Sequence, residues 1–206
     1  MMGTAIAMRL EAIVLAAGAS SRFSGGKLLA PWGDGVLLDS ALAAAFAAPV
    51  RFVNVIWGGD ARVPVAAGSF AARLGATQRL RLVRAERHAD GVAASLKAGV
   101  ASLNSDCAGS FVFLGDMPRI PQTIGAVLAD ALTQGATAAA PSFGGQRGHP
   151  VLFSASLFPA LLALSGDRGG ASVLAGLGEA LALVPAPDNG VLFDVDRPED
   201  LGVIGP

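Results

Sequence analysis

Short runs of consecutive apolar residues alternate along most of the chain with longer segments rich in Ala and Leu. Runs that are apolar at every position are typical of strands buried on both faces, and the longer segments have the length of helices. This order of strand and helix predicts a mostly parallel sheet with helices on both faces. The predicted strands span residues 12–15, 52–57, 80–84, 111–114 and 137–140, and the predicted helices span residues 38–46, 63–74, 92–103 and 124–132.

The pattern becomes less regular after Pro141. We interpret the later elements as a small β appendage to the sheet, because no linker or repeat marks a second domain. The prediction is one domain over residues 1–206, in which residues 1–10 form a loose N-terminal segment. The later elements are a Gly-rich turn at 144–148, a strand at 151–153, small helices around 157–164 and 172–177, and strands at 181–184 and 191–194.

Composition narrows the class of protein. Hydrophobic residues make up 52% of the 206 residues and charged residues 15%, which is typical of a compact globular chain. The net charge of -1, with no run of Lys or Arg, argues against binding to nucleic acid or to a membrane surface. Cys107 is the only cysteine, so no internal disulfide or multi-cysteine metal site forms. The first residues carry no signal-peptide pattern, and we expect a cytoplasmic protein.

The loop after the first predicted strand contains small residues and two cations, Arg22 and Lys27. In an open α/β sheet this turn is the usual phosphate position, where backbone N–H groups near Gly18 and the two cations can hold a triphosphate. The loop has neither the Gly-Lys-Ser/Thr ending of a P-loop nor the three spaced glycines of a dinucleotide site. The simpler alternative is that its glycines only form turns and its cations are solvated.

Carboxylates follow two other predicted strands. Asp116 comes directly after the strand at 111–114, where a hard oxygen ligand facing a triphosphate loop suits Mg²⁺. Asp194 and Asp196 stand two residues apart and would point the same way in a strand, so either could share the metal. Glu199 and Asp200 are better explained as acids in the first turn of a helix. For Asp116 the alternative is an Asp in a turn before Pro118.

These motifs together resemble the molybdenum-cofactor cytidylyltransferases. Residues 15–27 match that family's Leu-Ala-Ala-Gly-x-Ser-x-Arg-Met-Gly-x-x-Lys pattern except at Phe23 and Ser24. Residues 115–118 are similar to its metal-binding motif, and residues 194–201 resemble its Asp-x-Asp-Thr-Pro-Glu-Asp segment, with Arg197 in place of Thr. The resemblance implies a single-domain Rossmann-like nucleotidyltransferase fold with a mostly parallel central sheet.

The resemblance also assigns roles to individual residues. It implies that Arg22, Lys27 and Asp116 are catalytic, and it favours Asp196 over Asp194 as the second metal ligand. Residues 91–99 resemble the family's Gly-Met-x-x-Ser-Leu-x-x-Gly motif with Val92 for Met, and Arg87 and His88 stand where the family often has Asn and an aromatic residue. The implied nucleotide-binding residues are Leu15, Ala16, Ala17, Gly18, Arg22, Lys27, Gly91, Ser95 and Asp116.

The side of the second substrate has its own motif. Residues 147–150 match the family's Arg-Gly-His-Pro string, which implies that Arg147 and His149 bind the acceptor. A structural hydrogen bond is the alternative role for His149. Asp167 lies in a Gly-Asp-x-Gly-like turn on that side, and its alternative role is to cap the following helix.

The resemblance implies Mg²⁺-dependent transfer of CMP from CTP to the phosphate of molybdopterin, with Mn²⁺ as a substitute metal and release of pyrophosphate. It also implies transient contact with a molybdenum hydroxylase or its chaperone. One alternative is another phosphorylated acceptor, such as methylerythritol phosphate. A second is guanylyl transfer, although Ala16-Ala17 resembles the cytidylyl members. A third, of a different class, is a carrier of molybdopterin or nucleotide without turnover.

Overall fold

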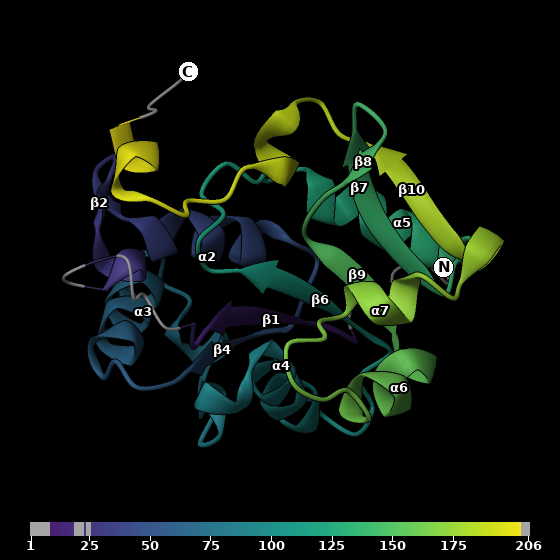
Figure 1. Cartoon of the computed structure of the whole chain (residues 1–206), viewed down its shortest axis with the longest axis horizontal. Coiled ribbons are helices and arrows are strands. Elements are labelled where there is room, and N and C mark those ends of the chain that lie inside the picture. The colour runs from purple at the N-terminus through teal and green to yellow at the C-terminus, as the bar shows by residue number, and fades with distance from the viewer. Residues whose placement is uncertain (1–8, 19–22, 24–25, 203–206) are drawn as a thin grey trace.

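The computed structural model describes residues 9–18, 23 and 26–202, and these form one α/β domain (Figure 1). Their strands are β1 (Leu10–Ala16), β2 (Pro31–Trp32), β3 (Gly35–Val36), β4 (Phe52–Trp57), β5 (Leu80–Arg84), β6 (Gly109–Leu114), β7 (Ala138–Phe143), β8 (Gln146–Arg147), β9 (Val151–Ser154) and β10 (Leu181–Pro185). Their α-helices are α2 (Leu37–Ala47), α3 (Arg62–Arg73), α4 (Val92–Ala101), α5 (Ile124–Thr133), α6 (Phe158–Leu162) and α7 (Ala171–Leu174).

The central sheet has the strand order β10-β7-β9-β6-β1-β4-β5, with β8 paired to β7. The pairs of β1 with β4 and β6, of β4 with β5 and of β7 with β10 are parallel, whereas β9 runs antiparallel between β6 and β7. The predicted α/β class, with a mostly parallel sheet and a small antiparallel part, is therefore confirmed. The short strands β2 and β3 form a separate antiparallel pair.

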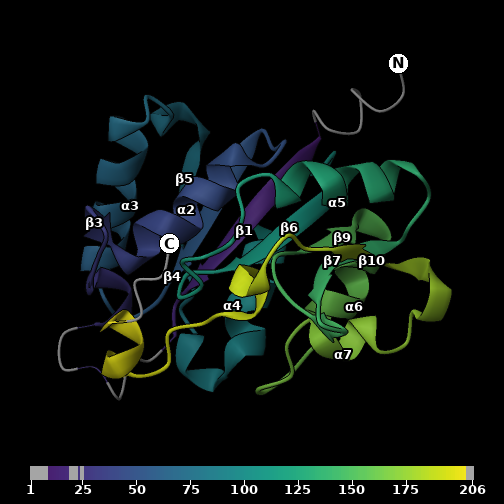
Figure 2. The ribbon, with the colours of Figure 1, turned by 90° about the horizontal axis from the view of Figure 1, so that it is seen from above.

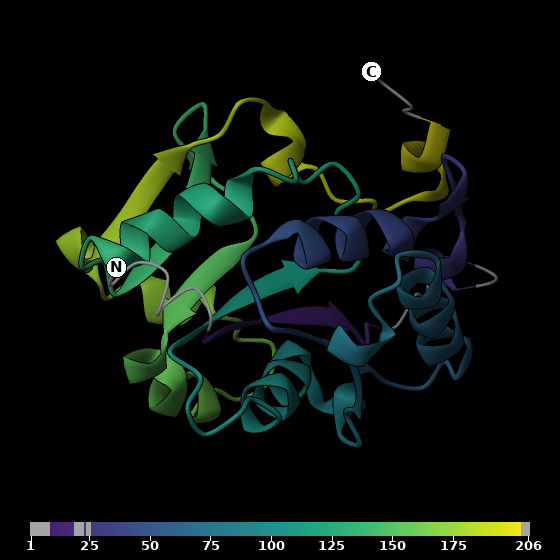
Figure 3. The same ribbon diagram turned by 180° about the vertical axis from the view of Figure 1, so that it is seen from behind.

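Helices cover both faces of the sheet, as Figures 2 and 3 show. Successive side chains of a strand point to opposite faces. In β1, Ala12 and Val14 accordingly join the core under α2, α3 and α5, while Ile13 joins the core under α4, α6 and α7. The strands are buried on both sides, which explains why their sequences are apolar at consecutive positions.

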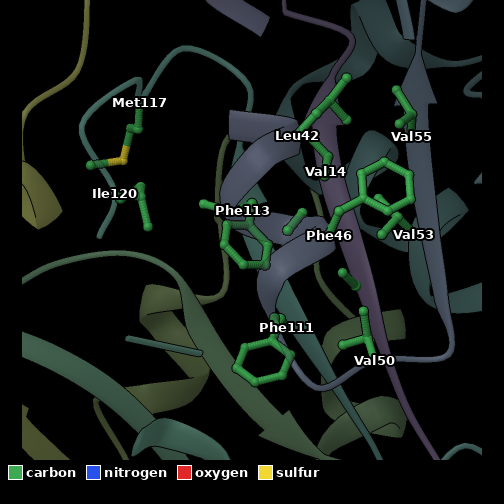
Figure 4. Packing of buried hydrophobic residues seen from close by; sticks show 14 of the residues in the cluster. Val14, Leu42, Phe46, Val50, Val53, Val55, Phe111, Phe113, Met117 and Ile120 are labelled. Atoms are coloured by element: carbon green, nitrogen blue, oxygen red, sulfur yellow. The ribbon is translucent and has the colours of Figure 1, made fainter. Parts of the chain in front are cut away.

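Figure 4 shows part of the first of these cores. Val14 and Val55 from β1 and β4 lie near Leu42 and Phe46 of α2, and Phe113 of β6 lies beside them. Burial of an aliphatic or aromatic side chain of this size contributes roughly 1.5–3 kcal/mol. This packing fixes the carboxyl ends of β1, β4 and β6 side by side, and the candidate site lies at these ends.

Three sequence expectations need correction. Residues 191–194 do not form a strand, because the segment begins with a 3₁₀-helix (Asn189–Leu192) in which Asp188 accepts a hydrogen bond from the backbone N–H of Gly190. Leu10 does not belong to a loose N-terminal segment, since it pairs with Gly109 and is fully buried. The expected turn at 144–148 is shorter: Gly144 and Gly145, both with positive φ, form the turn of the β7–β8 hairpin.

No helix in the described ranges has both the length and the apolar character needed to cross a bilayer.

Candidate active site

The site is built where β1 and β6 end together. The backbone N–H of Gly115 donates to the carbonyl oxygen of Leu15 at 2.9 Å, which extends the pairing of the two strands by one residue. A Cβ on Gly115 would lie 3.0 Å from that same oxygen, so the close approach favours glycine. Asp116 therefore leaves the sheet directly beside the end of β1.

Lys27 reaches Asp116 from the other end of the loop that follows β1. Gly26, at a φ of 90°, turns the chain into the 3₁₀-helix Lys27–Leu29, and the buried side chain of Leu28 anchors that helix. The Nζ atom of Lys27 donates to Oδ2 of Asp116 at 2.5 Å and lies 3.6 Å from Oδ1 of Asp196. One ammonium thus lies close to two carboxylates, and its side chain is only 15% exposed.

The C-terminal segment brings Asp196 to this position. Figure 1 shows it in yellow, running from the β10 side of the molecule toward β2. Phe193 packs near Trp32, with 6.3 Å between ring centroids, and Val195 is fully buried. The backbone N–H of Val195 donates to the carbonyl oxygen of Asp116 at 3.0 Å. These contacts tie the segment to the turn after β6.

Asp200 fixes the backbone that carries Asp196. Its Oδ2 accepts hydrogen bonds from the backbone N–H groups of Arg197 at 2.7 Å and Asp196 at 2.9 Å, and these bonds lower the pKa of the Asp200 carboxyl. Asp194 does not share a strand face with Asp196, contrary to expectation. Burial, followed by the charges of Asp196 and Asp116, raises the pKa of the Asp194 carboxyl.

A cavity of about 550 Å³ opens at these strand ends. It brings together the described residues of the predicted nucleotide site, except Ala16, which lines a small neighbouring cavity. Arg22 lies outside the described residues. The side chains that line the main cavity without having been assigned to it include His88 and Asp167. The predicted residues that line it are Leu15, Ala17, Gly18, Lys27, Gly91, Ser95 and Asp116.

The turn before α4 explains why Asp167 lies in this cavity. Gly91 has a φ of 103°, and a Cβ there would lie 2.6 Å from both Oδ1 of Asp167 and the carbonyl oxygen of Gly166. That carbonyl also accepts the backbone N–H of Ala93 at 3.1 Å. Asp167 thus packs against the start of α4, and the residue at the N-cap of α7 is Gly170.

A second cavity of about 250 Å³ adjoins the first, and the two share Leu15, Val92 and Leu114 in their walls. Its lining is largely apolar but includes Arg147 and His149, the two residues predicted for the acceptor. Nδ1 of His149 is buried and has no hydrogen-bond partner in the described part of the chain. Burial lowers the pKa of His149, so the neutral ring is favoured.

Comparison with known proteins identifies the family. A family model described as the MobA-like NTP transferase domain matches residues 12–182. The Rv0371c homologue of Mycobacterium sp. strain JC1 is 29% identical, with coverage of 94% of this chain and 93% of that one and a TM-score of 0.72. No curated protein sequence gives a match.

Two further crystal structures are below 25% identity and show a shared fold. Rv0371c of Mycobacterium tuberculosis in complex with manganese is 24% identical, covers 94% of this chain and 96% of its own, and has a TM-score of 0.70. The 4-diphosphocytidyl-2C-methyl-D-erythritol synthase of Anaerococcus prevotii is 13% identical, with coverage of 96% and 95% and a TM-score of 0.75. With its fold and with residues 12–182 matched by the family model, the chain belongs to the MobA-like NTP transferase family and is a nucleotidyltransferase.

Proposed function

We propose that this nucleotidyltransferase moves CMP from CTP to the phosphate of molybdopterin and releases pyrophosphate. The observation that carries the proposal is the junction of two cavities beside one charged cluster. The larger cavity contains Lys27 and Asp116, and the smaller one contains Arg147 and His149. Two substrates bound in these cavities would meet at the shared walls, and holding two reactants together is the main catalytic requirement of nucleotidyl transfer.

The residues present fit a divalent cation. Asp116 and Asp196 both approach the same Lys27 ammonium, so a single cation can lie between their carboxylates. Mg²⁺ is commonly held by one or two carboxylates together with substrate phosphates. Among the described residues, no group of three or more His, Cys, Asp or Glu side chains is placed to hold a metal ion without such phosphates. The manganese complex of Rv0371c supports Mg²⁺ or Mn²⁺ in this role. When bound, such a cation neutralises negative charge on the phosphates.

Residues of the chain supply positive charge to the phosphates of CTP and hold them in position. On this proposal, Lys27 exchanges part of its contact with Asp116 for the phosphate oxygens of CTP and stabilises the pyrophosphate as it leaves. Arg22, from the same loop, adds a second positive charge. Among the described residues, a Cβ on Gly18 would meet no atom within 4 Å, which leaves its backbone room to approach a phosphate closely.

The second cavity suits a planar heterocycle better than a small sugar phosphate. Its wall includes Phe153, Leu96 and Leu174, which offer apolar surface to a ring system. His149 forms part of the wall of this cavity, and the exposed Arg147 can bind the acceptor phosphate. These features support a pterin acceptor over methylerythritol phosphate.

The test is pyrophosphate release from CTP or GTP with Mg²⁺ and molybdopterin, together with detection of the dinucleotide. We expect turnover with CTP, and a loss of about 100-fold or more in Asp116→Asn. Asp130→Asn, an exposed carboxylate on α5, is the matched control and should keep wild-type activity. Turnover only with GTP would assign a guanylyl transferase, and acceptor binding without pyrophosphate release would assign a carrier.

A further inference from the structure

His88 lines the main cavity and has no role in the reaction proposed above. It begins the 3₁₀-helix His88–Asp90, just beyond β5, and β5 is joined to β4 at its end by the hydrogen bond from Ala85 N–H to the carbonyl oxygen of Trp57. Lys27 and Asp116 lie at the end of β6, and the sheet order is β6-β1-β4-β5. Three strand spacings, about 14 Å, therefore separate the ends of β6 and β5. An extended nucleotide separates its base and its phosphates over a similar span.

Two contacts fix the ring of His88. Its Nδ1 lies 3.0 Å from the carbonyl oxygen of Ala85. Gly58 and Gly59 leave room for the ring, because a Cβ on Gly58 would lie 2.7 Å from Cδ2 and a Cβ on Gly59 would lie 3.3 Å from Nε2. The same Cβ on Gly58 would lie 3.1 Å from the carbonyl oxygen of Ala17, another cavity residue. The ring is thus held against the cavity wall.

The contact with Ala85 decides which ring nitrogen accepts. A carbonyl oxygen can only accept, so Nδ1 carries the hydrogen and donates to it. In the neutral ring, Nε2 then has a lone pair and can only accept. Within the described residues, Nε2 has no hydrogen-bond partner. In that tautomer, the ring presents a planar acceptor beside Gly59 in the wall of the main cavity.

We propose that Nε2 of His88 accepts a hydrogen bond from the exocyclic amino group of the nucleobase, and that this contact selects CTP over UTP. The inference rests on the proposed function, since the nucleotide must occupy the main cavity. Cytosine carries an amino donor where uracil carries a carbonyl oxygen, which would leave Nε2 facing a second acceptor. A site built to bond a donor discriminates well against an analogue that lacks it, because its own polar atom is left unpaired.

The experiment is a cycle that removes each hydrogen-bond partner in turn, first the exocyclic amino group of the base and then the imidazole of His88. Isothermal titration calorimetry in the presence of Mg²⁺ measures the Kd of CTP, of UTP and of a CTP analogue. The analogue has a 2-pyrimidinone base, which lacks the amino group. The proteins are the wild type and His88→Phe, whose flat ring can still pack against Gly58 and Gly59. We expect removal of the amino group to weaken binding about tenfold in the wild type and less than about threefold in the variant.

Asp167, a carboxylate that also lines the cavity, supplies the comparison variant Asp167→Asn, which should keep the wild-type preference. An equal effect of amino removal in wild type and His88→Phe would overturn the inference, as would loss of the preference in Asp167→Asn alone. If His88→Phe does not fold, as judged by its thermal unfolding, the wild type decides: equal binding of CTP and its analogue overturns the inference. Failure of the wild type to bind any nucleotide would instead refute the proposed function.

Discussion

Lys27 shows how one side chain can organise a site. Its ammonium lies near carboxylates from two distant parts of the chain, and the partial burial of the pair makes the attraction stronger than that of a surface salt bridge. On the proposed mechanism, phosphate oxygens compete with Asp116 and Asp196 for the same ammonium. Nucleotide binding and the arrangement of the two aspartates are therefore coupled through Lys27.

His149 allows a prediction about pH. Burial lowers its pKa below the ordinary value of 6.5, so the unfolded chain takes up a proton at a higher pH than the folded chain does. The stability that comes from the neutral ring is complete above about pH 6.5 and falls as the pH is lowered toward the folded pKa. We expect the wild type to lose more free energy of unfolding than His149→Gln between about pH 7 and pH 5.5, by at most about 1.4 kcal/mol per pH unit. Urea unfolding at several pH values measures this, and identical pH profiles would contradict it.

At the scale of elements, the first turn of α4 lines the main cavity, and the helix packs on β1 and β4. Its contact with β1 depends on a helical glycine: a Cβ on Gly99 would lie 2.8 Å from Cγ2 of Ile13. Glycine in a helix otherwise costs stability, so a position that keeps it should have a packing reason. The close approach of α4 to β1 supplies that reason here.

A comparison of two glycine substitutions tests this packing explanation for Gly99. Gly99→Ala should lower the free energy of unfolding by roughly 1–3 kcal/mol, because the methyl group overpacks the contact with Ile13. In Gly68→Ala, inside α3, the new Cβ meets no atom of the described residues within 4 Å, and the substitution should raise the free energy of unfolding by about 0.5–1 kcal/mol. Thermal or denaturant unfolding reports both values. A rise in the free energy of unfolding for both variants would show that helix propensity alone governs the two positions.

At the scale of the whole molecule, the carboxyl ends and the amino ends of the strands carry different groups of polar residues. The site occupies the carboxyl ends of the strands, whereas a buried polar network occupies the amino ends. Glu11 is fully buried there, and it accepts hydrogen bonds from Arg51 at 3.1 Å, from Asn54 at 3.2 Å and from the backbone N–H of Asn104 at 3.3 Å. Arg51 also pairs with Asp106, and that bond is the largest contribution to the raised pKa of the Arg51 guanidinium.

This separation predicts that stability and activity can be changed independently. Glu11→Ala removes the buried acceptor from its three donors and should lower the free energy of unfolding by about 3 kcal/mol. The folded variant should keep kcat/KM within about twofold, because effects at distant sites are independent. Glu179→Ala, an exposed carboxylate, is the control and should change stability by less than about 0.5 kcal/mol. A parallel loss of kcat/KM and stability in Glu11→Ala would contradict the separation.

The sequence predicted much of the central sheet but less of the periphery. The predicted strands at 52–57 and 80–84 coincide with β4 and β5, and the helix predicted at 63–74 is α3 shifted by one residue. The error at 191–194 arose because the apolar side chains of Val191 and Val195 are buried by a 3₁₀ turn and an irregular segment instead of a strand. Apolar character alone does not distinguish these conformations.

The candidate site was also predicted only in part. Lys27 and Asp116 stand in recognisable motifs, and the structure brings them into contact. Asp167 was expected on the acceptor side or as a helix cap, and His88 was given no role, yet both line the main cavity. The available signal for His88 was its position just before the Gly91 turn.

The order of strands and helices, the glycine turns and the carboxylate after β6 are local properties, and the sequence by itself determined them through apolar periodicity and turn chemistry. Tertiary structure alone decided which side chains meet. The approach of Asp196 to Lys27 depends on the burial of Val195 and on its hydrogen bond to the backbone of Asp116. The place of His88 depends on two glycines after β4. Such contacts arise when distant segments pack on one sheet, and short-range sequence patterns do not encode them.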